Sequence, residues 1–144
     1  MNKKDLVLSA LADYGTTEIV GGKHNIKILK YFEDAGHSWV QNDEMAWCAA
    51  FLNAVLARAD LPHTGKLNAR SFLELGIETT EPEIGDIVVL WRVAQDSPYG
   101  HCGLFIAHDE SWIYILGGNQ ANAVNITKFP VYMLLGYRKL EIEA

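Results

Sequence analysis

The sequence predicts an α+β domain in which N-terminal helices pack on a C-terminal antiparallel β-sheet. In the first half of the chain, apolar residues recur at helical spacing, and after Pro82 they form the runs typical of strands. Helices first and strands second indicate an α+β fold. The 144 residues are enough for one domain, residues 1–144, whose core needs no disulfide or metal.

Four stretches are expected to form helices. Residues 6–14 and 26–35 each carry an amphipathic pattern that ends at a glycine. The stretch from about 46 to 59 is apolar on nearly every side, so this helix belongs in the centre of the domain. A shorter helix covers about 68–75 and also ends at a glycine.

The second half is expected to contain five strands. Residues 86–92 form a continuous apolar run, as a buried strand would. Strands over 101–107 and 112–116 follow, with a polar turn between them. Weaker strand patterns cover 123–128 and 135–139.

Charge and hydropathy exclude two classes of partner. The net charge is −6, and no basic cluster is larger than Lys3 with Lys4, so we expect no nucleic-acid binding. No stretch approaches the roughly 18 apolar residues of a membrane helix, and the N-terminus lacks the apolar core of a secretory signal. We therefore expect a monomeric chain that is synthesised in the cytoplasm without a signal peptide and does not insert into membranes.

The two cysteines, Cys48 and Cys102, are expected to be free thiols, because a chain without a secretory signal keeps its cysteines reduced. The sequence has no Cys-x-x-Cys motif and no His/Cys pairs at zinc spacing. We expect no metal site and no cofactor.

Cys48 is the candidate nucleophile. It opens the apolar helix, where backbone N–H groups and the helix dipole favour a thiolate. The alternative is a small buried hydrophobic residue, the commonest fate of a free cysteine.

His101 is the candidate base. It begins a strand between two glycines that allow another group to approach closely, and histidine suits proton transfer at neutral pH. Asn119 is the candidate for the polar group that accepts the second imidazole N–H and fixes the tautomer. Gln120 is its rival, because a turn in this segment could present either side chain.

Four other residues could lie in or near the site. Adjacent strand residues face opposite sides, so with His101 in the site, Cys102 is expected to face the core. Trp47 and Tyr99 flank the candidate residues, and each could either pack in the structure or line a substrate cleft. Asn42 is a candidate to join the Cys48 backbone N–H in binding an oxyanion.

These stretches resemble the NlpC/P60 and CHAP-type papain-like cysteine hydrolases, most closely a small CHAP-like group of bacterial and prophage genomes. Seven blocks carry the resemblance, in order along nearly the whole chain. They are Glu18-Ile19-x-Gly21 with His24-Asn25, Asp43-Glu44-x-x-Trp47-Cys48-Ala49-Ala50-Phe51, Ala69-Arg70-Ser71, Gly85-Asp86-Ile87-Val88, Gly100-His101-x-Gly103, Gly117-Gly118-Asn119-Gln120 and Leu135-Gly136-Tyr137-Arg138.

The resemblance implies a papain-like α+β fold and hydrolysis of amide bonds in bacterial peptidoglycan. By position, Cys48 matches the nucleophile of the family, His101 the base and Asn119 the third polar residue. Some relatives carry an acidic residue two positions before that asparagine, where this chain has Gly117. The reaction could be that of a stem-peptide endopeptidase or of an N-acetylmuramoyl-L-alanine amidase.

Two other functions stay open from the sequence. One is a non-catalytic wall-binding or phage structural module with a papain-like fold, and the other is a papain-like hydrolase of a non-wall amide. Action on the cell wall would require release by phage lysis or a specialised secretion apparatus. An antibacterial effector would also need an immunity protein as partner.

Overall fold

The structure is a computed structural model that describes residues 2–17, 25–36 and 47–140. In these ranges the helices are α1 (Lys3–Leu11), α2 (Ile26–Asp34), α3 (Cys48–Arg58) and the 3₁₀ helices η1 (Ala69–Glu74) and η2 (Val131–Met133). The strands are β1 (Ile77–Thr79), β2 (Ile87–Trp91), β3 (Gly100–His108), β4 (Trp112–Gln120), β5 (Ala123–Pro130) and β6 (Leu134–Lys139).

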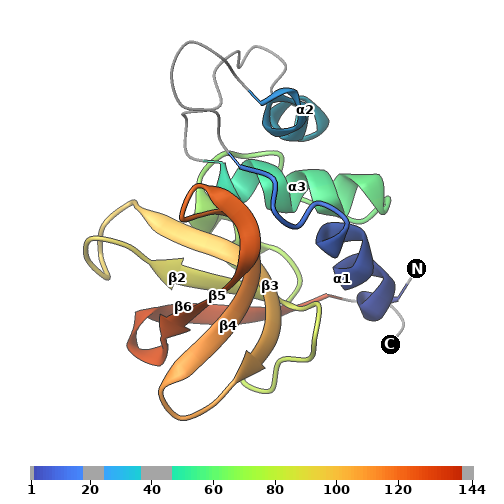
Figure 1. The fold of residues 1–144 in the computed structure, drawn as a ribbon. Helices are drawn as coiled ribbons and strands as arrows, with labels where there is room; N and C mark the ends of the chain where they lie inside the picture. The colour runs from blue at the N-terminus through green and yellow to red at the C-terminus, as the bar shows by residue number, and fades with distance from the viewer. Residues whose placement is uncertain (1, 18–24, 37–46, 141–144) are drawn as a thin grey trace.

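The strands form one six-stranded antiparallel sheet in the order β1-β6-β2-β3-β4-β5. The predicted α+β class, with helices packed on a C-terminal antiparallel sheet, is thus confirmed. Figure 1 shows α3 lying between α2 and the strongly curved sheet, with α1 beside the end of α3. None of the helices in the described part of the chain is long and apolar enough to cross a membrane.

Local sequence explains where the first two helices begin. The Asn2 side chain accepts a hydrogen bond from the backbone N–H of Asp5, and the Asp5 side chain accepts one from the backbone N–H of Asn2. These two hydrogen bonds form a capping box at α1. Asn25 caps α2 by accepting the N–H of Lys27 at 2.8 Å. The predicted helices over 6–14 and 26–35 are confirmed with shifted boundaries.

Helix α3 is the centre of the core, as its composition predicts. Residues 48–56 are all buried, including Asn53, whose side chain is fully engaged by the loop after the helix. Asn53 accepts the N–H groups of Thr64 and Gly65 and donates to the carbonyl of Lys66 at 2.8 Å. A buried amide is tolerated here because its polar atoms are paired.

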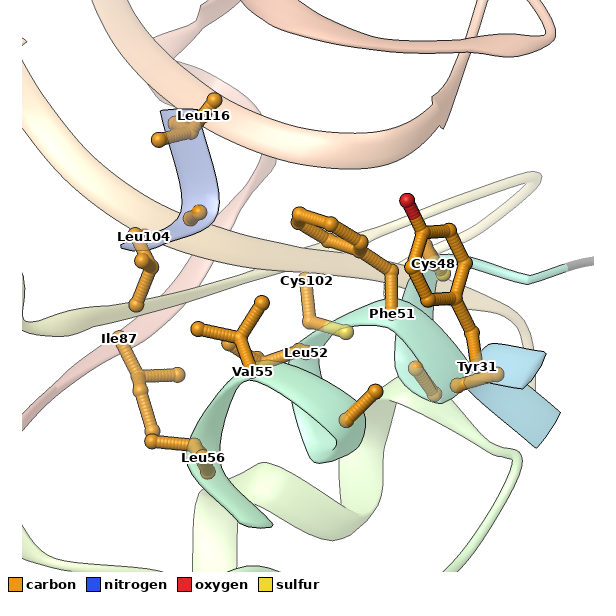
Figure 2. Packing of buried hydrophobic residues seen from close by; sticks show 14 of the residues in the cluster. Tyr31, Cys48, Phe51, Leu52, Val55, Leu56, Ile87, Cys102, Leu104 and Leu116 are labelled. Atoms are coloured by element: carbon orange, nitrogen blue, oxygen red, sulfur yellow. The ribbon is translucent and has the colours of Figure 1, made fainter. Parts of the chain in front are cut away.

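Close packing between α3 and the sheet depends on Gly118 in β4. A Cβ at this position would lie 2.7 Å from the Cβ of Phe51 and 2.7 Å from the indole of Trp47. Only a glycine lets the strand approach the start of α3 this closely. Figure 2 shows Phe51 of α3 next to Tyr31 of α2, and their rings pack edge to face with centroids 5.1 Å apart.

The sheet has a hydrophobic cluster on each face. Val89 and Cys102 belong to the cluster that packs against α3. Their neighbours in the chain face the other way: Leu90 belongs to the second cluster, and it pairs with His101. The alternation of side chains along paired strands therefore places His101 and Cys102 on opposite faces.

The structure adds two elements and alters two that the sequence predicted. Strand β1 and the 3₁₀ helix η2 were not predicted, and residues 69–74 form a 3₁₀ helix. Strand β4 extends to Gln120 instead of ending at 116, because the hairpin turn lies at Ala121 and Asn122. Both turn residues have positive φ, 51° and 62°, as a two-residue type I′ turn requires.

A buried ion pair joins α1 to the sheet. The Lys3 ammonium lies 2.8 Å from a carboxylate oxygen of Asp86, and the two side chains are 5% and 0% exposed. Asp86 also accepts the backbone N–H groups of Glu83 and Leu140, at 2.8 and 3.1 Å. The Asp86 carboxylate thus connects the start of β2 with α1 and with the end of β6.

Candidate active site

Cys48 is the first residue of α3, directly after Trp47 at the N-cap. Among the described residues no side chain caps this helix, and Phe51 donates a hydrogen bond to the Trp47 carbonyl at 2.9 Å. Backbone N–H groups in an uncapped first turn favour negative charge. The helix start therefore provides the electrostatic setting that a thiolate requires.

The surroundings of Cys48 hold the pKa of its thiol well below the ordinary value. The largest cause is a hydrogen bond from the Cys102 thiol, which acts together with a hydrogen bond and positive charge from His101 and the backbone N–H of Cys102. Burial opposes them, since only 6% of Cys48 is exposed. The favourable interactions outweigh this penalty.

His101 is held from the side opposite the thiol by Gln120. The imidazole Nε2 lies 2.9 Å from the Gln120 amide oxygen, and both residues are buried. The Gln120 amide nitrogen donates to the carbonyls of Ile115 and Asn125, at 3.1 and 2.8 Å. Because this nitrogen is committed, the amide oxygen faces His101 and accepts a hydrogen bond from Nε2–H, which leaves Nδ1 for Cys48.

Gln120, not Asn119, is therefore the partner of His101, and the preference for Asn119 as orienting residue is wrong. The pairing of β4 with β5 shifts its register between Gly117 and Gln120, and Asn119 takes a positive φ of 57°. This irregularity interrupts the strict alternation of β4 and turns the Gln120 side chain toward the imidazole. Asn119 instead lies on the wall of a neighbouring pocket.

The pKa of His101 is raised above its ordinary value. Burial lowers this pKa, but the hydrogen bond and negative charge of Cys48 outweigh burial, and Gln120 adds to their effect. A lowered Cys48 pKa and a raised His101 pKa widen the pH range in which a thiolate faces an imidazolium. The structure thus brings together two of the three predicted catalytic residues, Cys48 and His101, and replaces the third.

Cys102 lies in the core, as expected from the alternation along β3, but it is not remote from the site. Figure 2 shows its side chain projecting toward α3, the helix that begins with Cys48. Both cysteines are free thiols. Burial and the neighbouring Cys48 raise the pKa of Cys102 far above its ordinary value, so Cys102 is the thiol of the pair and Cys48 the thiolate.

Replacing Cys102 with alanine is expected to raise the pKa of Cys48, because the hydrogen bond from the Cys102 thiol is lost. The pH dependence of Cys48 alkylation by iodoacetamide measures this change, with peptide mapping to locate the label. Cys102→Ser keeps a hydroxyl donor and serves as the matched control. An alkylation profile that Cys102→Ala leaves unchanged contradicts this role for Cys102.

The other predicted site residues have different outcomes. Trp47 is fully buried and stacks on Tyr31 at 6.0 Å, so of its two alternatives the structure shows packing in the core. Tyr99 is 61% exposed just before β3, and its contact with substrate stays a prediction. Asn42, the candidate oxyanion donor, lies outside the described residues.

A pocket of about 370 Å³ opens beside His101. His101 and Gln120 contribute to its wall together with Arg92, whereas Cys48 does not. Sequence reasoning missed Arg92. The signal was available in the hairpin register, because Arg92 follows by two residues the Leu90 that pairs with His101, and positions i and i+2 share a face.

The described ranges contain no group of three or more His, Cys, Asp or Glu side chains able to hold a metal ion. In comparisons with known proteins, the chain matches no family model and no curated protein.

Proposed function

We propose that this chain is a cysteine hydrolase that cleaves amide bonds through a Cys48-His101-Gln120 site. One observation carries the proposal: His101 interacts with Cys48 on one side and with the Gln120 amide oxygen, at 2.9 Å, on the other. A nucleophile, a base and a group that orients the base are the parts required for acyl transfer.

In the first half of the reaction, the Cys48 thiolate attacks the substrate carbonyl carbon and forms a C–S bond. The oxyanion that develops lies at the start of α3, where the Cys48 backbone N–H is a donor. Collapse of the tetrahedral intermediate breaks the C–N bond, and the Nδ1 proton of His101 goes to the leaving amine. The products of this half are a thioester on Cys48 and a free amine.

In the second half, neutral His101 takes a proton from water, and the hydroxide attacks the thioester carbonyl. Collapse of this intermediate breaks the C–S bond and releases the carboxylic acid. Cys48 returns to the thiolate and His101 to the imidazolium. Gln120 accepts a hydrogen bond from Nε2 in both halves of the reaction. Nδ1 is therefore the imidazole nitrogen that faces the reacting atoms in each half.

The substrate class that we propose is the amide bonds of bacterial peptidoglycan. The support for this class is the resemblance to NlpC/P60 and CHAP-type enzymes, together with a domain whose helices precede an antiparallel sheet. A papain-like fold is part of the same proposal. It agrees with a cysteine at the start of the central helix and a histidine at the start of a sheet strand.

The test is digestion of purified peptidoglycan, with released amines quantified and the fragments identified by mass spectrometry. We expect Cys48→Ala to lose amine release by on the order of 10⁴-fold or more, because the thioester cannot form. Fragment masses distinguish cleavage between stem-peptide residues from cleavage of the sugar–peptide link.

Circular dichroism of Cys48→Ala provides the control for folding. Release of the same amounts of amine by the folded variant would rule out the mechanism. In another outcome, the wild type releases no fragments while Cys48 still reacts as a thiolate at neutral pH. That result would contradict peptidoglycan as the substrate but would agree with a reactive Cys48 thiolate.

A further inference from the structure

We propose that the pocket beside His101 is a binding site for the carboxylate of the leaving amine, so that the preferred substrates release an amino acid or short peptide with a free carboxylate. This inference rests on the proposed function and deepens it. The pocket holds about 370 Å³, the lower range of small-molecule sites, which suits one or two amino-acid residues.

The charged side chains in the described lining of the pocket are cationic. Arg92 lies on its wall, and the described lining includes no aspartate or glutamate. This local positive charge is opposite in sign to the chain as a whole, whose net charge is −6. A guanidinium favours planar anions that it can bind through two parallel hydrogen bonds, and a carboxylate is such an anion.

The hydrogen-bond donors of the pocket are available to a ligand. Within the described part of the chain, no hydrogen bond or ion pair engages the side chains of Arg92, Asn119 or Asn122. By contrast, Gln120 is committed to His101 and Asn125, and the Thr127 hydroxyl donates to Asn125 at 2.6 Å. Two amides and a guanidinium thus remain to bind a carboxylate.

The lining of the pocket also includes large apolar side chains, those of Leu90, Phe129 and Met133. The centroid of the Phe129 ring lies 5.0 Å from that of the His101 imidazole, so the apolar part of the lining reaches the catalytic base. A ligand with a short aliphatic part between its amine and its carboxylate fits this pattern. An amino acid has this composition.

The position of the pocket assigns it to the leaving group. His101 and Gln120 belong to both the catalytic contacts and the pocket wall, whereas Cys48 does not line the pocket. The acyl part of the substrate becomes attached to Cys48, and the amine is the part that takes the proton of His101. The group on the amine side is therefore the one beside the pocket.

The test is binding of glycylglycine and of glycylglycine amide to the folded protein, followed by amide NMR chemical shifts. The two probes differ in the carboxylate. We expect glycylglycine to bind at least about ten-fold more tightly, the effect of one charge-assisted hydrogen-bonded pair. Arg92→Gln should remove this difference, and Lys66→Gln, which removes an exposed cation outside the pocket, should keep it.

Equal affinity for the two probes, no saturable binding, or a preference that survives in Arg92→Gln would each overturn the carboxylate site. The experiment is independent of hydrolysis. Selective glycylglycine binding by a protein that cleaves no amide would contradict the proposed function alone. Hydrolysis without selective binding would contradict the pocket assignment alone.

Discussion

Replacing His101 with alanine is expected to lower kcat/KM by on the order of 10³-fold, because the leaving amine loses its proton donor and the water its base. The same change removes the imidazolium that helps to hold the Cys48 pKa low, so that pKa rises. The pH profile shows both effects. In the wild type, the rate rises with pH as Cys48 deprotonates and falls as His101 loses its proton. In His101→Ala we expect the rate no longer to fall at alkaline pH. The increase of the rate with pH should begin at a higher pH than in the wild type.

The matched control is His108→Ala, which removes a histidine from the exposed far end of the same strand. His108 packs edge-on against Phe105 and Tyr137 but has no part in the proposed chemistry. We expect this control to keep both limbs of the pH profile. An alkaline limb that persists in His101→Ala would show that another group titrates there.

Asp86→Ala is expected to lower the free energy of unfolding by about 3–5 kcal/mol, because it leaves the Lys3 ammonium buried without its 2.8 Å partner. The backbone N–H groups of Glu83 and Leu140 also lose their acceptor. Urea denaturation at neutral pH measures the change. Adding Lys3→Met should recover part of the loss, since it removes the buried ammonium that has lost its close partner.

Glu83→Ala is the control, because Glu83 contacts the same lysine at 3.4 Å from a side chain that is 54% exposed. An exposed ion pair contributes about 1 kcal/mol or less, so we expect a small loss. If the two substitutions cost the same, the buried pair does not anchor α1 to the sheet as proposed.

The sequence was sufficient to predict the α+β class, the central apolar helix and the position of Cys48 at its start. These features follow from short-range patterns, namely the period of apolar residues and the type of residue at a helix end. Strand alternation also predicted that the side chains of His101 and Cys102 lie on opposite faces of the sheet. Each of these inferences needed only residues that are near one another in the chain.

Only the tertiary structure shows that Gln120, and not Asn119, is the partner of His101. This depends on an irregularity in β4 that the residue pattern does not predict. The pairing of Gln120 with Asn125 across the hairpin then fixes which amide atom faces His101. Similarly, Trp47 flanks Cys48 in sequence, but the approach of Gly118 from β4 buries it completely.

What the sequence determined by itself was therefore the chemistry available: a thiol at a helix start, a histidine at a strand start and amides nearby. The tertiary structure decided which of these groups meet, which face the core and where Arg92 lies relative to His101. The physical reason is that these contacts depend on the registers and close approaches of segments far apart in the chain, and those are set by packing across the whole sheet.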